Sequence, residues 1–194
     1  PMWNNGMTSD STNENSYEYY TWRRAIDTVA DPEFLDMNLL SAPGLSLQGL
    51  TAHMISVCES RADSLALIDL DKAYEPIYEG NYSTISNHSD RITYTPTQLA
   101  NRLKDRRIDS SYGATFYPWV QTRDEGTGQL VWIPPTVAMM GVLASSERKS
   151  KIWFAPAGFN RGGLTDGAAG IPITQVTTRL SSRDRDTLYN ARIN

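Results

Sequence analysis

The sequence predicts an α/β fold, with a mainly parallel sheet flanked by helices on both faces and an added β-hairpin. Stretches with helical spacing of apolar residues alternate with short apolar runs that are typical of strands. One of these runs, residues 64–70, is nearly continuous in apolar residues, as expected for a parallel strand buried on both faces. The turn from Gly126 to Gly128 lies between two strand-like pieces and indicates the hairpin.

Local signals place each element along the chain. Residues 1–16, rich in Asn, Ser and Thr, are expected to form a loop or the remnant of an upstream segment. Caps and prolines mark several helix ends: Asp31-Pro32 ends the first helix, Ser46 is the expected N-cap of the second, and Thr95-Pro96 opens the third. The expected helices cover 17–30, a segment from the cap at Ser46 to about 61, a segment from 96, a segment that Pro134-Pro135 start and that runs to 151, and 181–191. The expected strands cover 34–40, 64–70, 110–121 and 173–180.

Composition limits the class of protein. A chain of 194 residues can build one substantial core, so residues 17–194 are expected to form a single domain. The net charge of -4 argues against a sequence-independent grip on nucleic acid, which depends on Lys and Arg. No apolar run approaches the roughly 20 residues that span a bilayer. The single cysteine, Cys58, cannot form an internal disulfide, which suits a reduced cytoplasm.

Few residues are candidates for catalysis or metal binding. His53 lies within an expected helix, where a structural role is the simpler interpretation, and His88 lies in a Ser-rich segment without a nucleophile motif. The pair Asp69 and Asp71 could ligate a hard cation. A second acidic pair, Asp184 and Asp186, is interleaved with arginines and is better explained as a solvated helix face. The sequence therefore indicates neither a cofactor nor a metal.

Two loops are candidates for a phosphate site. The turn "SAPGLS", residues 41–46, follows the first expected strand but has one glycine where a dinucleotide fingerprint uses three. The loop "IWFAPAGFNRGGL", residues 152–164, has glycines and Arg161, but its aromatic residues are bulky for an anion cradle. Prolines, glycines and aromatics favour a stiff packed loop of the kind that suits a rigid contact surface, and for Trp153 a core position and an interface position remain alternatives. In "TFYPWV", residues 115–120, core packing and an interface remain equal alternatives for the aromatic side chains.

Several of these segments together resemble the sheath proteins of contractile phage tails. The run "VWIPPTVAMMGVLASSERKSKIWFAPAGFNRGGL" and the ending "LSSRDRDTLYNARIN" are similar to the family's Pro-Pro helix, its Trp-x-Ala-Pro-Ala-Gly loop and its Asp-bearing final helix. The segments "DMNLLSAPG" and "CESRADSLALIDL" resemble its first strand and turn and its second strand. The resemblance covers most of residues 17–194.

This resemblance implies a structural subunit rather than an enzyme. Such subunits form stacked six-fold rings around a tail tube and contract on a signal from the baseplate, without cofactor or hydrolysis. It also implies the partners: neighbouring sheath subunits, the tube, the baseplate and the tail terminator, in a virion assembled in the host cytoplasm. The chain is then expected to be the α/β portion of a longer subunit, truncated at both ends and lacking the family's N-terminal and C-terminal arms.

The family motifs mark residues expected to shape the core of the subunit or its contacts. These are Pro134, Pro135, Trp153, Ala155, Pro156, Ala157, Gly158, Asn160, Arg161, Gly162, Leu188, Tyr189 and Asn194. A nucleotide- or phosphate-binding α/β enzyme, based on the "SAPGLS" turn, remains the alternative hypothesis.

Overall fold

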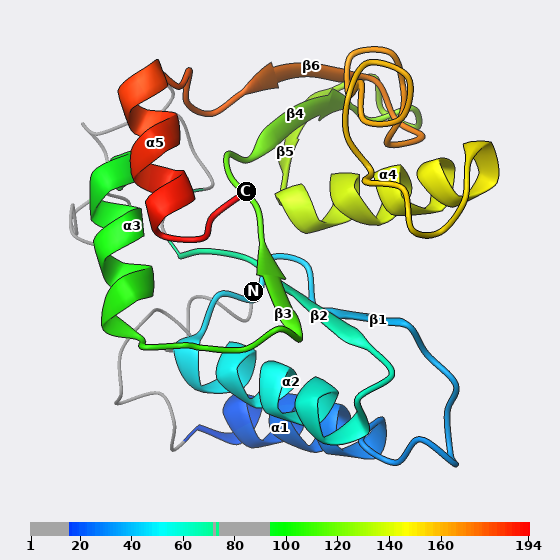
Figure 1. Ribbon diagram of the computed structural model, residues 1–194, viewed down its shortest axis with the longest axis vertical. Helices are drawn as coiled ribbons and strands as arrows, with labels where there is room; N and C mark the ends of the chain where they lie inside the picture. The colour runs from blue at the N-terminus through cyan, green and yellow to red at the C-terminus, as the bar shows by residue number, and fades with distance from the viewer. Residues whose placement is uncertain (1–15, 72, 74–93) are drawn as a thin grey trace.

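The computed structural model describes residues 16–71, 73 and 94–194, and these residues form five helices and six strands (Figure 1). The helices are α1 (Tyr17–Thr28), α2 (Gln48–Arg61), α3 (Pro96–Asp105), α4 (Pro135–Lys149) and α5 (Ser182–Asn190). The strands are β1 (Leu39–Ser41), β2 (Leu65–Ile68), β3 (Gly113–Thr115), β4 (Val120–Arg123), β5 (Leu130–Ile133) and β6 (Ile173–Val176).

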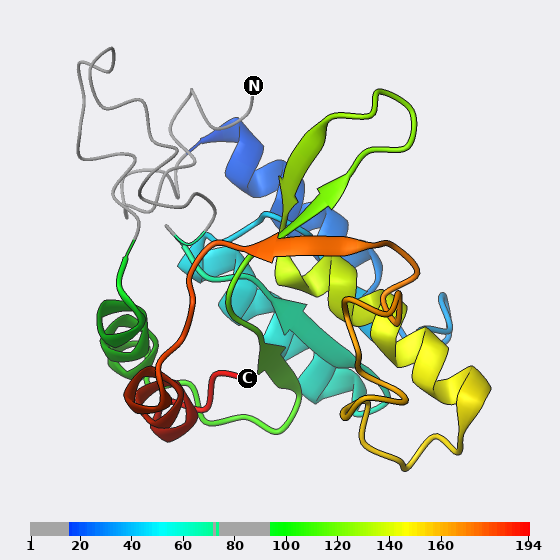
Figure 2. The ribbon, with the colours of Figure 1, turned by 90° about the horizontal axis from the view of Figure 1, so that it is seen from above.

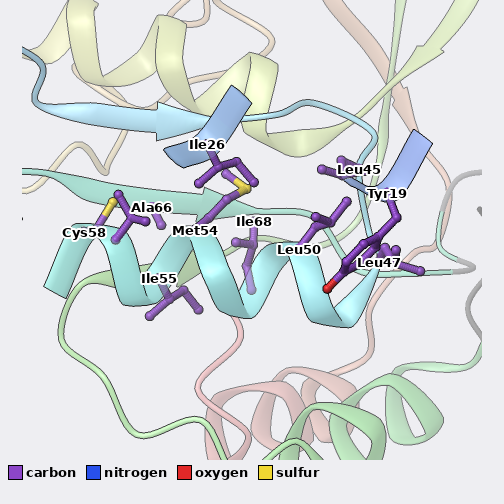
Figure 3. Packing of buried hydrophobic residues seen from close by; sticks show 11 residues of the cluster. Tyr19, Ile26, Leu45, Leu47, Leu50, Met54, Ile55, Cys58, Ala66 and Ile68 are labelled. Atoms are coloured by element: carbon purple, nitrogen blue, oxygen red, sulfur yellow. The ribbon is translucent and has the colours of Figure 1, made fainter. Parts of the chain in front are cut away.

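The first sheet, sheet A, has the order β1-β2-β3, and both of its strand pairs are parallel. Helix α2 connects β1 to β2 and packs against β2, while α1 packs against α2 (Figure 1). Figure 3 shows Leu50, Met54, Ile55 and Cys58 of α2 among the buried side chains between the helices and the sheet. This apolar cluster is the core that fixes sheet A against its helices.

The second sheet, sheet B, has the order β5-β4-β6, and both of its strand pairs are antiparallel. Its core is built with α4, because Val120 and Ile173 of the sheet cluster with Ala138 and Val142 of the helix. The β4–β5 hairpin extends away from α4 (Figure 2). A third cluster lies where α3 packs against α5, and it includes the buried side chains of Leu99 and Leu188.

The α/β class is confirmed, and so are the parallel strands of the first half and the hairpin. The prediction of one mainly parallel sheet is wrong, because β4, β5 and β6 form a separate antiparallel sheet. The split occurs within the expected strand 110–121, which the structure divides into β3 and β4. Helices on both faces of one sheet remain a prediction.

Two further predicted boundaries are wrong. The expected strand 34–40 is a turn followed by the short strand β1, and the Phe34 side chain is exposed. The N-cap of α2 is Leu47, not Ser46, and no side chain caps this end of the helix. Leu47 is instead buried in the core of sheet A, so tertiary packing sets the start of α2.

The other helix starts follow their local signals. Thr95 caps α3 in a capping box with Gln98, and Ser181 caps α5 in the same way with Asp184. Pro135 is the first residue of α4, where its missing N–H has no intrahelical partner to lose. The last turn of α4 is basic, with Arg148 and Lys149 at the negative end of the helix dipole.

Candidate contact surface

The α4–β6 loop, residues 150–172, carries a group of exposed apolar side chains. Trp153 is 76% exposed and Phe159 is 94% exposed, and Ile152 and Phe154 are exposed beside them. Of the two placements that the sequence left open for Trp153, the structure therefore shows the exposed one. Side chains of this size are ordinarily found buried, and a group of them at a surface is typical of a contact site.

The tip of this loop is held by its own hydrogen bonds. The carbonyl oxygen of Ala155 accepts bonds from Arg161 Nε at 3.0 Å and from the Ala157 N–H at 2.8 Å. The Gly162 N–H closes the turn by donating to the carbonyl oxygen of Gly158. The backbone of Gly158 has a φ of 79°, in the left-handed region that favours glycine. A side chain at Gly162 would collide with the Ala157 backbone, so the tip is compact as well as exposed.

Arg161 also lies over the ring of Phe154, with 5.4 Å between the guanidinium carbon and the ring centroid. This geometry is a cation–π contact, and it holds the Phe154 ring against the loop. Lys149 Nζ, at the end of α4, donates to the carbonyl oxygen of Asn160 at 3.4 Å. Arg161 thus fastens the loop internally, and its Nε–H is not free to bind a phosphate.

The second half of the loop anchors it to the helix. Ala168 and Ala169 are buried against α4, and Leu164 and Ile171 pack on the same cluster. Gly141 of α4 allows this approach, because a Cβ there would lie 2.0 Å from the Ala169 carbonyl oxygen. The loop therefore presents its aromatic tip from a fixed base.

The "SAPGLS" turn does not offer a phosphate site. The Gly44 N–H, which an anion at this turn would need, donates to Oδ2 of Asp69 at 2.8 Å. Oδ2 also accepts a bond from the Thr136 hydroxyl at 2.9 Å, and Asp69 is 1% exposed. A carboxyl group of the chain itself therefore stands where an anion would bind. Burial raises the pKa of Asp69 above its ordinary value, although the bonds from Gly44 and Thr136 favour the charged form.

The remaining chemical candidates have structural partners. Asp71 accepts a bond from Arg102 at 2.7 Å and does not join Asp69 in a cation site. His53 Nε2 lies 2.6 Å from Oδ1 of Asp27, so it links α2 to α1. Across residues 16–71, 73 and 94–194, no cluster of three or more His, Cys, Asp or Glu side chains could hold a metal ion. His88 lies outside the described residues.

A shallow groove of about 260 Å³ lies between α2, α3 and β3. Ile55, Leu103 and Ile108 line it together with the basic side chains of Lys104 and Arg107. Its lining contains no His, Cys, Asp or Glu beside the hydroxyl groups of Ser110 and Thr115. Among the described helices, none is long and apolar enough to cross a bilayer.

The other motif residues divide between core and surface. Pro135 and Leu188 are buried, and Pro134 is the N-cap residue of α4. Tyr189 is 81% exposed on α5. Asn194 lies beside β3, where its N–H donates to the Thr115 carbonyl oxygen at 3.2 Å and its carbonyl oxygen accepts from the Tyr117 N–H at 2.8 Å. Pro156 is half-buried, and Ala155, Ala157, Gly158 and Asn160 are exposed.

Sequence reasoning missed a second surface. Residues 31–36, which we call the acidic turn, are all exposed and carry three carboxylates beside Phe34 and Leu35. The signal that could have found it is the mixture of Asp and Glu with apolar residues after Asp31-Pro32, which suits an exposed turn better than a strand.

Comparison with known proteins gives these surfaces a context. The chain is 26% identical over 179 residues to the tail sheath protein of Enterobacteria phage T4, a match that covers 88% of the chain. It is 21% identical over 180 residues to the tail sheath protein of Vibrio phage KVP40, covering 89% of the chain. The chain is a relative of phage tail sheath proteins. No family model matches it.

The relationship to tail sheath proteins is partial in one respect. The chain spans about a quarter of the length of each relative, 25% of one and 26% of the other. Along the chain itself the match is nearly complete, so it includes most of the described elements. The resemblance to tail sheath proteins is thereby confirmed.

Proposed function

We propose that this chain is part of a structural subunit of a contractile tail sheath. In this proposal, subunits assemble as stacked six-fold rings around a tail tube and contract to drive the tube through the host envelope. The observation that carries the proposal is the match to two tail sheath proteins over nearly the whole chain. The subunit would act without catalysis, cofactor or metal.

The surfaces of the chain are consistent with repeated assembly. The exposed aromatic side chains of the α4–β6 loop supply large contact area, and the hydrogen bonds of its tip limit the entropy lost on binding. Rigid contact surfaces suit a sheath, because contraction then consists of moving nearly rigid subunits between two packings. The free-energy difference between the packings would be summed over many subunits.

The proposal extends to organisation and partners. Residues 17–194 would form one α/β core domain of a longer subunit, and the chain would bind neighbouring subunits and the tube within the virion. The baseplate and the tail terminator would contact the ends of the sheath. The subunit would be made and assembled in the host cytoplasm.

Electron microscopy of the full-length protein, expressed with its tube partner, tests this proposal directly. We expect helical tubes or stacked six-fold rings, and discrete monomers under all conditions would contradict the proposal. A nucleotide panel in a thermal-shift assay provides the control for the enzyme hypothesis. Because Asp69 occupies the "SAPGLS" turn, we expect no rise in melting temperature with nucleotide concentration.

A further inference from the structure

Two exposed surfaces of the chain carry opposite charge. Between residues 148 and 161 the sequence has four basic residues, Arg148, Lys149, Lys151 and Arg161, and no acidic residue. The acidic turn has Asp31, Glu33 and Asp36 and no basic residue. In each segment the charged residues flank exposed apolar side chains in the sequence, and this mixture is the composition of a contact site with a polar rim.

The acidic turn is ordered and supported from below. The Glu33 N–H donates to Oδ1 of Asp31 at 2.9 Å, and the Phe34 N–H donates to the Asp31 carbonyl oxygen. Arg61, whose side chain is fully buried, holds the turn by donating to the carbonyl oxygen of Leu35 at 2.8 Å. Phe34, 71% exposed, is therefore presented from a fixed backbone.

The basic surface has matching features. Trp153, Phe154 and Phe159 are exposed in the loop that follows exposed Arg148, in the last turn of α4, and exposed Lys151, just after the helix. The second half of this loop is anchored on α4. The two surfaces lie apart in the molecule: the acidic turn follows α1 beneath sheet A, whereas the α4–β6 loop lies beside sheet B (Figure 1). A single chain therefore presents both halves of a complementary pair in different places.

We propose that the α4–β6 loop of one copy docks onto the acidic turn of a second copy. The aromatic tip would pack against Phe34 and Leu35, and the basic residues would face the three carboxylates. Because the two surfaces differ, the contact is head-to-tail, and repeated contacts of this kind generate a ring or an open filament. This inference rests on the proposed function, because the partner that binds the acidic turn is taken to be a second copy of the chain. It names the residues that would join neighbouring subunits.

Cross-linking between single cysteines in the full-length protein tests this contact. The variants Lys151→Cys and Glu33→Cys are mixed under mild oxidation. Cys58, the only cysteine of this chain, is buried and free. Any cysteine in the rest of the full-length protein is first replaced by serine. We expect a disulfide-linked dimer to form in this mixture several-fold faster than in either variant alone. It should also form several-fold faster than when either variant is mixed with Arg183→Cys, which places the cysteine on α5. Equal rates in all mixtures would overturn the proposal.

Charge reversal provides the second arm, with Ile152→Cys and Glu33→Cys as the cross-linking pair. Adding Arg148→Glu and Lys151→Glu to the Ile152→Cys variant should slow the cross-link by about tenfold or more. Adding Arg183→Glu and Arg185→Glu instead gives the same change of net charge on α5 and should leave the rate unchanged.

Reversing the charge of the acidic turn completes the charge-reversal experiment. Asp31→Lys and Asp36→Lys, added to the Glu33→Cys variant, should restore much of the rate toward the Arg148→Glu and Lys151→Glu partner. A cross-linking rate that does not change with any of these charge substitutions would overturn the proposed pairing of the two surfaces.

The outcomes separate this inference from the proposed function. One outcome is that tubes or rings form equally well with Arg148→Glu and Lys151→Glu and that no cross-link joins the α4–β6 loop of one copy to the acidic turn of another. This outcome would overturn the contact and leave the sheath proposal standing. A heterotypic cross-link in a protein that never forms tubes or rings would support the contact and contradict the sheath proposal.

Discussion

The hydroxyl group of Thr136 donates a hydrogen bond to Oδ2 of Asp69 at 2.9 Å, across 67 positions of sequence. This bond joins the end of β2 in sheet A to the first turn of α4, the helix that packs on sheet B. The same oxygen accepts from the Gly44 N–H, so one buried carboxyl group connects three segments of the fold.

The first prediction concerns the pH dependence of this connection. Burial raises the pKa of Asp69 above its ordinary value of 3.8, so the folded state binds more protons than the unfolded state between the two values. The contribution of Asp69 to stability is therefore complete below about pH 3.8 and is lost as pH rises through the folded-state pKa. Asp69→Asn should remove this decline, measured as the free energy of unfolding by urea at a series of pH values.

Asp124 provides a control of opposite sign. Hydrogen bonds from Thr127 and Gly126 lower the pKa of its exposed carboxyl group. Its contribution to stability is present above the ordinary carboxyl pKa and is lost as pH falls through the lower folded-state value. Asp124→Asn should therefore change the pH profile only at its acidic end, and identical profiles for both variants would contradict the assignment.

A second prediction follows from the exposure of Trp153. Trp153→Ala should change the free energy of unfolding by less than about 1 kcal/mol, because surface substitutions remove little buried area. Leu50→Ala, at a fully buried position, should cost about 2 to 5 kcal/mol in the same urea titration. A loss of several kcal/mol for Trp153→Ala would place this side chain in a core instead.

A third prediction concerns Gly141 in α4. Alanine ordinarily stabilises a helix interior by about 1 kcal/mol relative to glycine. Here the new Cβ would meet backbone atoms of Ala169, so Gly141→Ala should instead destabilise the chain by about 1 to 3 kcal/mol, measured by urea denaturation. Ala144→Gly, at an exposed position of the same helix, should show the ordinary cost of about 1 kcal/mol, and a stabilising Gly141→Ala would refute the close packing.

The fourth prediction tests Arg61. Its guanidinium group donates to the carbonyl oxygens of Val29 and Leu35 and to the Asp63 carboxylate. Lysine has a single ammonium group and cannot donate to all of these acceptors at once, so Arg61→Lys should destabilise the chain by about 2 to 4 kcal/mol. Arg192→Lys, in an exposed ion pair with Asp109, should change stability by less than about 1 kcal/mol. Chemical denaturation of both variants gives the comparison.

The sequence signals that succeed are local ones. The capping boxes at Thr95 and Ser181 and the proline at 135 lie within a few residues of the helix ends that they set. The "LALI" run of β2 also predicts its own burial and parallel pairing, since continuous apolar strands are covered on both faces.

The errors have long-range causes. The apolar residues Phe34 and Leu35 suggest a strand, but Arg61, 26 positions beyond Leu35, holds that segment as a turn. The division of residues 110–121 between two sheets depends on pairing partners as distant as β6. The sequence leaves the placement of Trp153 open, because apolar character alone does not distinguish a buried loop from an exposed contact surface. Its exposure depends on which half of the loop packs on α4.

The pairing of Asn194 with the outer edge of β3 bears on how fast the chain folds. Its bonds to Thr115 close a loop of 79 positions, and β2 and β3 are also distant in sequence. Contacts between distant residues form late, because the entropy of a large loop must be lost before they stabilise anything. We therefore expect α1 and α2, which are local helices, to form before sheet A is completed at this edge.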